Sequence, residues 1–245
     1  MHIVPSFTSA KAVPDADGNL VDNPDIVELM DNVKSETIFI IDRSGSMDGE
    51  RITIAKKALI LSLRSLPYDS FFNIVSFGSS FNFMHIKSVK ADQHTIEAAI
   101  KKINTFGADM GGTEILAPLM ASFNAPALIN YQKNIFLLTD GSVSNADLVI
   151  KETQQHCSGN RSRVFTIGIG NGVSDHFIQG VAAAGNGSHD VIHDLTIIED
   201  RVISMLQGSY SPSLTNFRIE FDTTKIEAMA PALSAESHIL KDKPL

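Results

Sequence analysis

Thr37-Ile38-Phe39-Ile40-Ile41-Asp42-Arg43-Ser44-Gly45-Ser46 is the stretch that decides the fold of this chain. The run up to Ile41 is almost continuously apolar, which is typical of a parallel strand buried on both faces. It ends in Asp42, and the hydroxyls of Ser44 and Ser46 follow at alternate positions. Ligands of open α/β sheets bind beyond the carboxyl ends of the strands, so this pattern predicts a ligand site directly after a central strand.

Outward from this stretch, apolar strand patterns alternate with helical patterns. Strands separated by helices of about 10–15 residues indicate βαβ units with right-handed crossovers. We therefore predict an α/β fold: a doubly wound, mostly parallel central sheet with one short antiparallel edge strand and helices on both faces. The expected strands cover 37–42, 71–77, 134–139, 164–170 and 189–192, with the short edge strand near 83–87, and the expected helices cover 50–66, 92–104, 114–124, 144–157, 174–184 and 196–207.

The two ends of the chain do not continue this alternation. Residues 1–35 form an N-terminal extension with an acidic, turn-rich loop, and residues 36–208 form the α/β domain. In the C-terminal tail, 209–245, Phe217, Ile219 and Phe221 alternate with polar residues, as in a half-exposed strand. We expect this tail and residues 3–7 to form a small β-rich annex.

The composition of the chain argues against nucleic-acid binding and membrane insertion. The 245 residues are 43% hydrophobic and 20% charged, which is ordinary for a globular protein. A net charge of −8 argues against nucleic acid as a partner. The sequence has no run of about 18 apolar residues and no signal peptide, so we expect no membrane insertion. With Cys157 as its single cysteine, it indicates a reducing, cytoplasmic location, and we expect a monomer.

Two later segments supply chemistry that matches the first. Gly111-Gly112-Thr113-Glu114 carries another hydroxyl, and Ile135-Phe136-Leu137-Leu138-Thr139-Asp140-Gly141 ends a second buried strand in an acid. If the two strands are neighbours, both acids reach the same rim of the sheet. Hard oxygen donors select Mg²⁺, Mn²⁺ or Ca²⁺. The candidate metal-ligating residues are Asp42, Ser44, Ser46, Thr113 and Asp140.

Other interpretations of these loops remain open from the sequence. Thr113 can instead cap a helix that begins at residue 114. Asp48 and Asp109 are interpreted as solvated loop acids. Arg43 is expected to pack or form a salt bridge under the loop, with steering of an acidic ligand as the alternative. Cys157 is interpreted as a small buried hydrophobe rather than a reactive thiol.

The small number of charged ligands at this site predicts which group completes the coordination of the ion. If hydroxyls and waters contact the metal while Asp42 and Asp140 hold those waters, the ion keeps most of its positive charge. A carboxylate from a partner protein then completes its coordination. This arrangement predicts cation-dependent binding of a Glu or Asp.

These residues carry a family resemblance. Asp42-Arg43-Ser44-Gly45-Ser46 resembles the DxSxS signature of the von Willebrand factor A domain, and Thr113 and Asp140-Gly141 match the second and third loops of its metal-ion-dependent adhesion site (MIDAS). The resemblance covers about residues 36–208 and implies the fold and metal site described above. The chain is most similar to the intracellular proteins that pair a VIT domain with an A domain (the VWA5A-like group), which are related to the inter-alpha-trypsin inhibitor heavy chains. No VIT domain is recognisable in it, which suggests a fragment of a longer protein.

Three functions compete at this point. The expected one is a non-enzymatic, adhesion-type module that captures an acidic residue of a protein partner through the MIDAS metal. The alternative is an intramolecular scaffold domain of a larger VIT-containing protein, with a mainly structural metal. The least expected is a Mg²⁺-dependent phosphoryl-transfer enzyme, since the second acid that some phosphatases place two residues after the first is here Ser44.

Overall fold

The computed structural model describes residues 34–141, 143–158 and 162–210, together with the backbone of four short strands outside them. The chain divides into two units: Lys34–Tyr210, and Met1–Val33 with Ser211–Leu245. In the second of these, β1 (Ala12–Pro14) pairs with β2 (Leu20–Asp22), and β10 (Ser213–Leu214) with β11 (Ile239–Leu240), both antiparallel. The expected annex strands at residues 3–7 and 217–221 lie outside the described residues.

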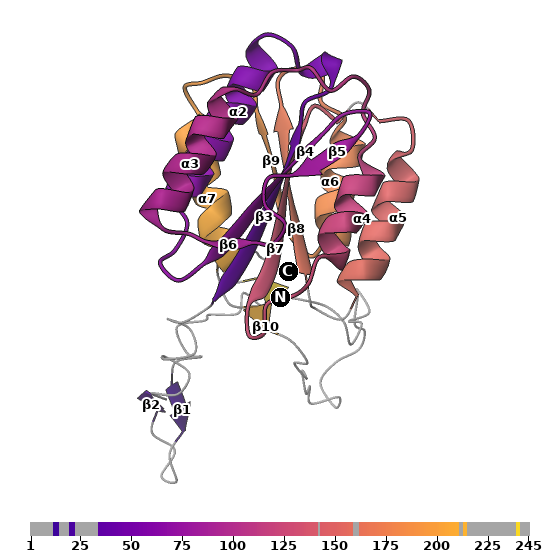
Figure 1. Cartoon of the computed structure of the whole chain (residues 1–245). Coiled ribbons are helices and arrows are strands. Elements are labelled where there is room, and N and C mark those ends of the chain that lie inside the picture. Colours follow the sequence, from indigo (N-terminus) through magenta and orange to yellow (C-terminus); the bar gives the residue numbers. More distant parts are fainter. Residues whose placement is uncertain are drawn as a thin grey trace, which may run out of the picture. The chain divides into compact units, whose positions relative to one another are not determined.

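A seven-stranded sheet forms the centre of the unit Lys34–Tyr210 (Figure 1). Its hydrogen-bonded order is β5-β4-β3-β7-β8-β9, and β6 also pairs with β4. The neighbours β4–β3–β7–β8–β9 are parallel, whereas β5 and β6 are antiparallel to β4. The strands are β3 (Ser35–Asp42), β4 (Phe71–Phe77), β5 (Phe81–Phe83), β6 (Val89–Lys90), β7 (Gln132–Thr139), β8 (Ser162–Ile169) and β9 (His189–Ile192).

Helices cover both faces of this sheet (Figure 1). Phe39 and Ile41 of β3 belong to a buried cluster with residues of α2, α3 and α7, whereas Ile38 and Ile40 belong to a second cluster with residues of α4, α5 and α6. Every residue of β3 is buried, because successive side chains enter opposite cores. The helices are α2 (Glu50–Arg64), α3 (Gln93–Asn104), α4 (Leu116–Asn124), α5 (Ala146–Cys157), α6 (Asp175–Ala184) and α7 (Ile198–Tyr210).

The predicted α/β architecture is confirmed, with a difference at the sheet edge. Instead of a strand near 83–87, the edge holds β5 at Phe81–Phe83 and the two-residue β6. The alternation of Phe81 and Phe83 about Asn82 already matches a half-exposed strand, and Met84 still donates its N–H to Ile74 O (2.7 Å). Beyond Met84 the chain turns away from β4 before it pairs again at Val89. None of the helices in the described part of the chain is long and apolar enough to span a membrane.

Candidate cation site

The topology brings the two strand-end acids to one rim. β3 pairs with β4 on one side and with β7 on the other, so the strand order reverses at β3. Asp42 is the last residue of β3, and Asp140 directly follows Thr139, the last residue of β7. Because neighbouring parallel strands end at the same edge, both carboxylates reach the rim at the upper end of the sheet in Figure 1. This is the switch-point crevice at which open α/β sheets bind ligands.

Asp42 is held from both sides by the protein. Its side chain is fully buried. Its Oδ1 accepts the backbone N–H of Ser44 at 2.8 Å, and its Oδ2 accepts the hydroxyl of Thr139 at 2.6 Å. Burial raises the pKa of Asp42, the hydrogen bonds from Ser44 and Thr139 oppose that shift, and the charge of Asp140 adds to it. The geometry fixes this carboxylate with two donors and brings its negative charge near that of Asp140.

The two serine hydroxyls meet in front of this carboxylate. Ser44 Oγ and Ser46 Oγ are 3.1 Å apart. Ser44 is buried and Ser46 is exposed, so the pair lies at the boundary between core and solvent. Adjacent oxygens of an octahedral ion with metal–oxygen distances of about 2.0–2.1 Å are separated by about 2.9 Å. The observed spacing is therefore close to what a small hard cation requires of two neighbouring ligands.

The third predicted segment lies against the first. Gly45 donates its N–H to Gly111 O at 2.8 Å, and Met110 donates its N–H to Arg43 O at 3.0 Å. These bonds join the Gly111–Thr113 loop to the DxSxS loop. Within the part of the chain that the structure describes, the Thr113 side chain forms no hydrogen bond with the other four predicted ligands. Helix α4 begins at Leu116, with Ile115 at its N-cap position, so the alternative reading of Thr113 as the helix cap is wrong.

Arg43 holds this third loop in place, as a salt bridge under the loop was expected to do. Its Nη2 donates to Asp109 Oδ1 at 2.5 Å, and its Nε donates to Gly107 O at 3.0 Å. The guanidinium also lies 4.4 Å from the centre of the Phe106 ring. The side chain of Asp109 is exposed, but it is paired with Arg43 rather than simply solvated. Arg43 is thus occupied in fixing the loop that carries Thr113.

Arg51 connects Asp140 to two other segments. From the first turn of α2, its Nη1 donates to Asp140 Oδ2 at 3.1 Å and to Ser46 O at 2.9 Å, and its Nη2 donates to Asn171 O at 3.0 Å. Asp140 is 2% exposed, so the pair is desolvated on the acidic side. A Cβ at Gly170 would lie 3.0 Å from Arg51 Cγ and Nε, so this glycine leaves room for the arginine stem.

The donor set fits a hard cation rather than a soft one. No cluster of three or more His, Cys, Asp or Glu that could hold a metal is found among the described residues. The site contains two carboxylates and hydroxyls, which are all oxygen donors. The two acids repel each other within a buried rim, and a cation would relieve that repulsion. The described residues therefore match an oxygen-ligated divalent ion.

Two residues of the candidate site are not among those predicted from the sequence. Thr139 appears there only within the buried strand, and Arg51 is not singled out at all. A hydroxyl placed directly before a strand-end acid was the available signal for Thr139. For Arg51 the sequence holds no comparable signal, because its partner Asp140 is 89 residues away.

Comparison with known proteins agrees with this geometry. The model of the von Willebrand factor type A domain matches residues 35–191. A von Willebrand factor A domain-containing protein of Dictyostelium discoideum is 36% identical over 199 residues, which cover 81% of this chain and 21% of the relative. Human von Willebrand factor A domain-containing protein 5A is 36% identical over 214 residues, covering 84% and 26%. The chain thus spans about a quarter or less of the length of these relatives.

Solved structures show the same fold. A von Willebrand factor type A protein from Catenulispora acidiphila superposes with a TM-score of 0.62 at 26% identity, covering 72% of this chain and 43% of that chain. Proximal thread matrix protein 1 from the mussel byssus, solved with a zinc-occupied MIDAS motif, gives a TM-score of 0.62 at 18% identity, with coverages of 76% and 50%. Manganese-loaded TRAP protein from Plasmodium vivax gives 0.56 at 16%, with coverages of 73% and 74%.

The last two likenesses establish the fold alone. The family model, in contrast, covers well over half of the chain, and both relatives exceed 30% identity over more than three quarters of it. The chain belongs to the von Willebrand factor type A domain family.

Proposed function

We propose that this domain is a divalent-cation-dependent protein-binding module that captures an acidic residue of a partner. The observation that carries the proposal is the pair of hydroxyls, Ser44 Oγ and Ser46 Oγ, 3.1 Å apart beside two buried carboxylates. Both oxygens of Asp42 already accept hydrogen bonds from the protein, and Asp140 accepts one from Arg51. This favours the hydroxyls as direct ligands and the acids as groups that hold metal-bound water.

The assignment of the ligands follows from these contacts. Ser44 and Ser46 would hold the ion directly, Thr113 would approach it from the third loop, and Asp42 and Asp140 would fix its waters. Mg²⁺ is the proposed ion, with Mn²⁺ or Ca²⁺ as substitutes, since all the donors are oxygens. When bound, the ion supplies a positive charge that its neutral ligands leave largely uncompensated. A Glu or Asp of a protein partner is the group that this charge selects.

Arg51 supports the same preference. Its guanidinium offsets the charge of Asp140, so the rim carries less negative charge toward an incoming carboxylate. The proposal assigns no catalytic step to the site. The phosphatases that form an aspartyl-phosphate need a strand-end carboxylate that can attack as a nucleophile. Asp42 does not suit that role, because it is fully buried and both of its oxygens accept hydrogen bonds. We place the module in the cytoplasm as a monomer, in line with its single cysteine.

A second candidate is an intramolecular scaffold with a mainly structural metal. It is favoured by the length comparison, since the part shared with this chain is only 21% of one relative and 26% of the other. In that case the acidic group would come from another domain of the same protein, such as a VIT domain. The coordination chemistry of the site would be the same.

Isothermal titration with Mg²⁺ and Mn²⁺ tests the metal assignment. The wild-type domain is expected to bind one ion, and Ser44→Ala is expected to weaken that binding at least tenfold. Asp48→Asn is the matched control, because Asp48 is an exposed acid of the same loop. Equal affinity in the Ser44→Ala and Asp48→Asn variants would refute the site.

Acidic peptides then separate the two functions. A module for partner capture is expected to retain a Glu-containing peptide in Mg²⁺, to release it in chelator, and to ignore the Gln-containing peptide of the same sequence. A structural metal is expected to raise the melting temperature without any peptide binding.

A further inference from the structure

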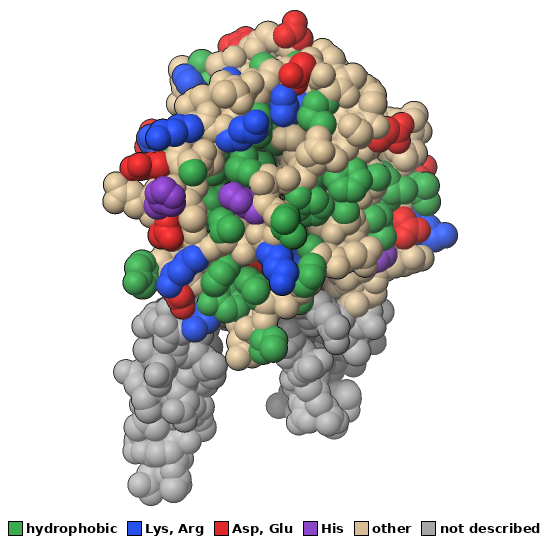
Figure 2. All heavy atoms as spheres, in the orientation of Figure 1, with side chains coloured by type: hydrophobic (Ala, Val, Ile, Leu, Met, Phe, Trp, Pro, Cys, Tyr) green, Lys and Arg blue, Asp and Glu red, His purple; other side chains and the backbone are tan. Residues whose placement is uncertain are grey.

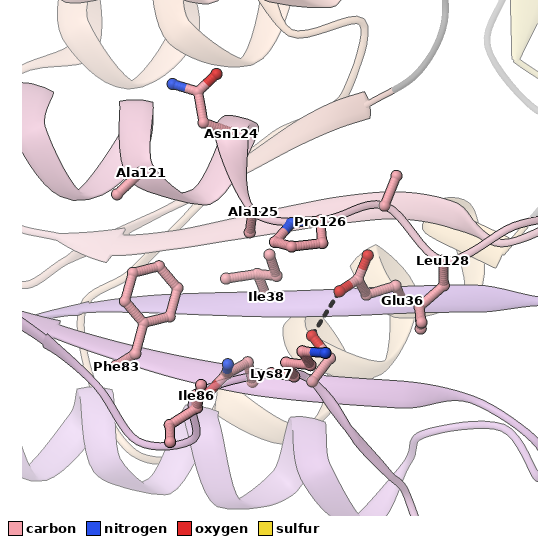
Figure 3. A pocket seen from close by; sticks show the side chains of 13 residues that line it. Glu36, Ile38, Phe83, Ile86, Lys87, Ala121, Asn124, Ala125, Pro126 and Leu128 are labelled. Atoms are coloured by element: carbon pink, nitrogen blue, oxygen red, sulfur yellow. Dashed lines mark hydrogen bonds between the residues drawn. The ribbon is translucent and has the colours of Figure 1, made fainter.

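A cavity of about 400 Å³ is lined by Glu36 and Ile38 in the first half of β3, and none of the candidate metal-ligating residues lines it (Figure 3). It is bounded by the β4–β5 edge of the sheet, by the link between β5 and β6, and by the C-terminal end of α4. Its size falls in the range of pockets that bind small groups, about 300–1,000 Å³. Glu36, at its floor, is six residues before Asp42 on β3, a separation of about 20 Å along a strand.

Glu36 is a buried acid that faces this cavity. It is 2% exposed and lines the cavity wall. Its Oε1 accepts the hydroxyl of Ser88 at 2.5 Å, which is the dashed contact in Figure 3. Among the described residues, no donor contacts its second oxygen, Oε2. A buried carboxylate is costly unless a cation or several hydrogen bonds compensate it, so Oε2 has unused capacity for a donor.

The lysines nearby do not fill this role. Lys133 is the cross-strand neighbour of Glu36, but its ammonium donates to the carbonyls of Ser122 at 3.2 Å and Ala125 at 2.6 Å, at the end of α4. The charge of Glu36 opposes the lowering of the pKa of Lys133 that burial causes, yet the two groups form no ion pair. Lys87 lies at the exposed rim, and within the described residues it also forms no ion pair.

The walls around Glu36 are mostly apolar. Ile38 and Phe83 line the cavity from the sheet, and Leu128 lines it from the segment after α4 (Figure 3). Ile86, at the mouth, is fully exposed, which is unusual for an isoleucine. Hydrophobic side chains also gather on the face of the molecule that presents β5 and α4 (Figure 2). A ligand for this cavity therefore needs an aliphatic body and one positive charge.

We propose that this cavity binds the side chain of a lysine presented by a protein partner. Its four-carbon stem packs between Phe83 and Ile86, and its ammonium donates to Oε2 of Glu36. Lysine is favoured over arginine because a bidentate guanidinium fork would have to share Oε1 with the Ser88 hydroxyl, whereas an ammonium needs only Oε2. The site is independent of the proposed cation site, and each can fail alone.

An NMR titration with peptides tests this inference. The probe is a seven-residue peptide with a central lysine flanked by valines, and its two matched controls carry acetyl-lysine or norleucine at that position. The lysine peptide is expected to shift the amide signals of Glu36, Ser88 and Ala125, with at least tenfold higher affinity than either control. Acetylation keeps the stem and removes the charge, so equal affinity for the acetylated peptide would overturn the proposal.

Variants of the protein complete the test. Glu36→Gln is expected to reduce affinity for the lysine peptide at least tenfold, whereas Glu97→Gln, an exposed glutamate of α3, leaves it unchanged. Ala121→Leu fills the cavity without changing its charge and is expected to abolish binding, while the Mg²⁺ affinity stays at the wild-type value. If no peptide binds at millimolar concentration, or if Glu36→Gln and Glu97→Gln behave alike, the assignment is wrong.

Discussion

Two opposing effects act on the charge of Asp42. It is fully buried, which penalises its charge, and it is fixed by donors on both oxygens, which stabilises its charge. Burial has the larger effect, since the pKa of Asp42 is raised. Ionised Asp42 therefore costs the metal-free domain folding free energy, which agrees with the proposal that this carboxylate acts at a cation site.

Asp42→Asn should separate stability from metal binding. The folded domain binds a proton at Asp42 more tightly than the unfolded chain does, so the ionised group opposes folding above its folded pKa. Without metal, the variant is expected to be at least as stable as the wild type at pH 7, and the difference should shrink as the pH falls through the folded pKa. Urea unfolding at several pH values measures this. A large loss of metal-free stability at pH 7 would contradict it.

Arg51→Gln should lower the metal-free stability of the domain and raise its affinity for a cation. It removes the cation that pairs with the buried Asp140, and the metal-free domain is expected to lose about 1–2 kcal/mol. The rim becomes more negative, so Mn²⁺ affinity should rise roughly tenfold. Arg64→Gln, an exposed arginine at the end of the same helix, is the control for both measurements. Unchanged Mn²⁺ affinity in Arg51→Gln would show that Asp140 does not influence the ion.

Cys157 should be inert in the folded domain. It is buried at the end of α5, and burial raises its pKa to about 12. At pH 8 this leaves about one thiol in ten thousand ionised, whereas an unperturbed cysteine is about a quarter ionised. A thiol-disulfide reagent is expected to react with the native protein only at the rate of unfolding. Rapid labelling under native conditions would contradict the buried assignment.

Single residues also show what the sequence can predict. Asp42, Ser44 and Ser46 are close in sequence, so their meeting follows from one local turn, and Asp140 follows from a strand-end rule. Arg51 does not, because its contacts reach Asp140 and Asn171 on separate strand-end loops. Glu36 also precedes the decisive stretch by one residue, yet nothing in its neighbours predicts a cavity.

At the scale of elements, loop packing positions the third segment of the site. Gly78, after β4, donates its N–H to Ser80 O and accepts the N–H of Glu114 at 2.9 Å. Ser79 meets the same loop, with its N–H donating to Met110 O at 2.7 Å. The loop that carries Thr113 is therefore attached to the ends of both β3 and β4.

Gly78→Ala should disturb this attachment. An added Cβ would lie 2.3 Å from Met110 O, which is backbone and cannot move without shifting the loop. The variant is expected to lose more than about 2 kcal/mol of stability and to bind Mg²⁺ more weakly. Gly208→Ala is the control, because within the described residues its added Cβ would have no atom within 4 Å apart from its chain neighbours and the nearby backbone of α7, and it should stabilise α7 by about 0.5–1 kcal/mol. Equal stability of the two variants would show that the loop is not fixed at Gly78.

The sequence predicts the bounds of the long helices and strands, whose apolar patterns are strong, but not those of the two short antiparallel strands. The helix and strand patterns of the βαβ units predict the bounds of β4 and β9 and place most other elements within about two residues of where they are found. The two short antiparallel strands are only three and two residues long, so their position depends on pairing with β4 rather than on their own sequence. For the same reason, the sequence pattern predicts one strand near 83–87 instead of these two.

In the unit Lys34–Tyr210 as a whole, the strand order determines which loops lie beside each end of β3. Because β3 lies between β4 and β7, its carboxyl end is a crevice flanked by two loops, and its amino end lies beside α4 and the cavity. One central strand therefore carries a residue of each proposed site, Asp42 at one end and Glu36 at the other. Periodicity predicts that such a sheet exists, but only long-range pairing decides which loops meet.

The proposed metal ligands can be observed by anomalous diffraction from crystals of the domain grown with Mn²⁺. We expect one strong peak within about 2.3 Å of both Ser44 Oγ and Ser46 Oγ, which should be absent in Ser44→Ala crystals grown in the same way. A manganese peak elsewhere on the molecule, or none at saturating Mn²⁺, would contradict it.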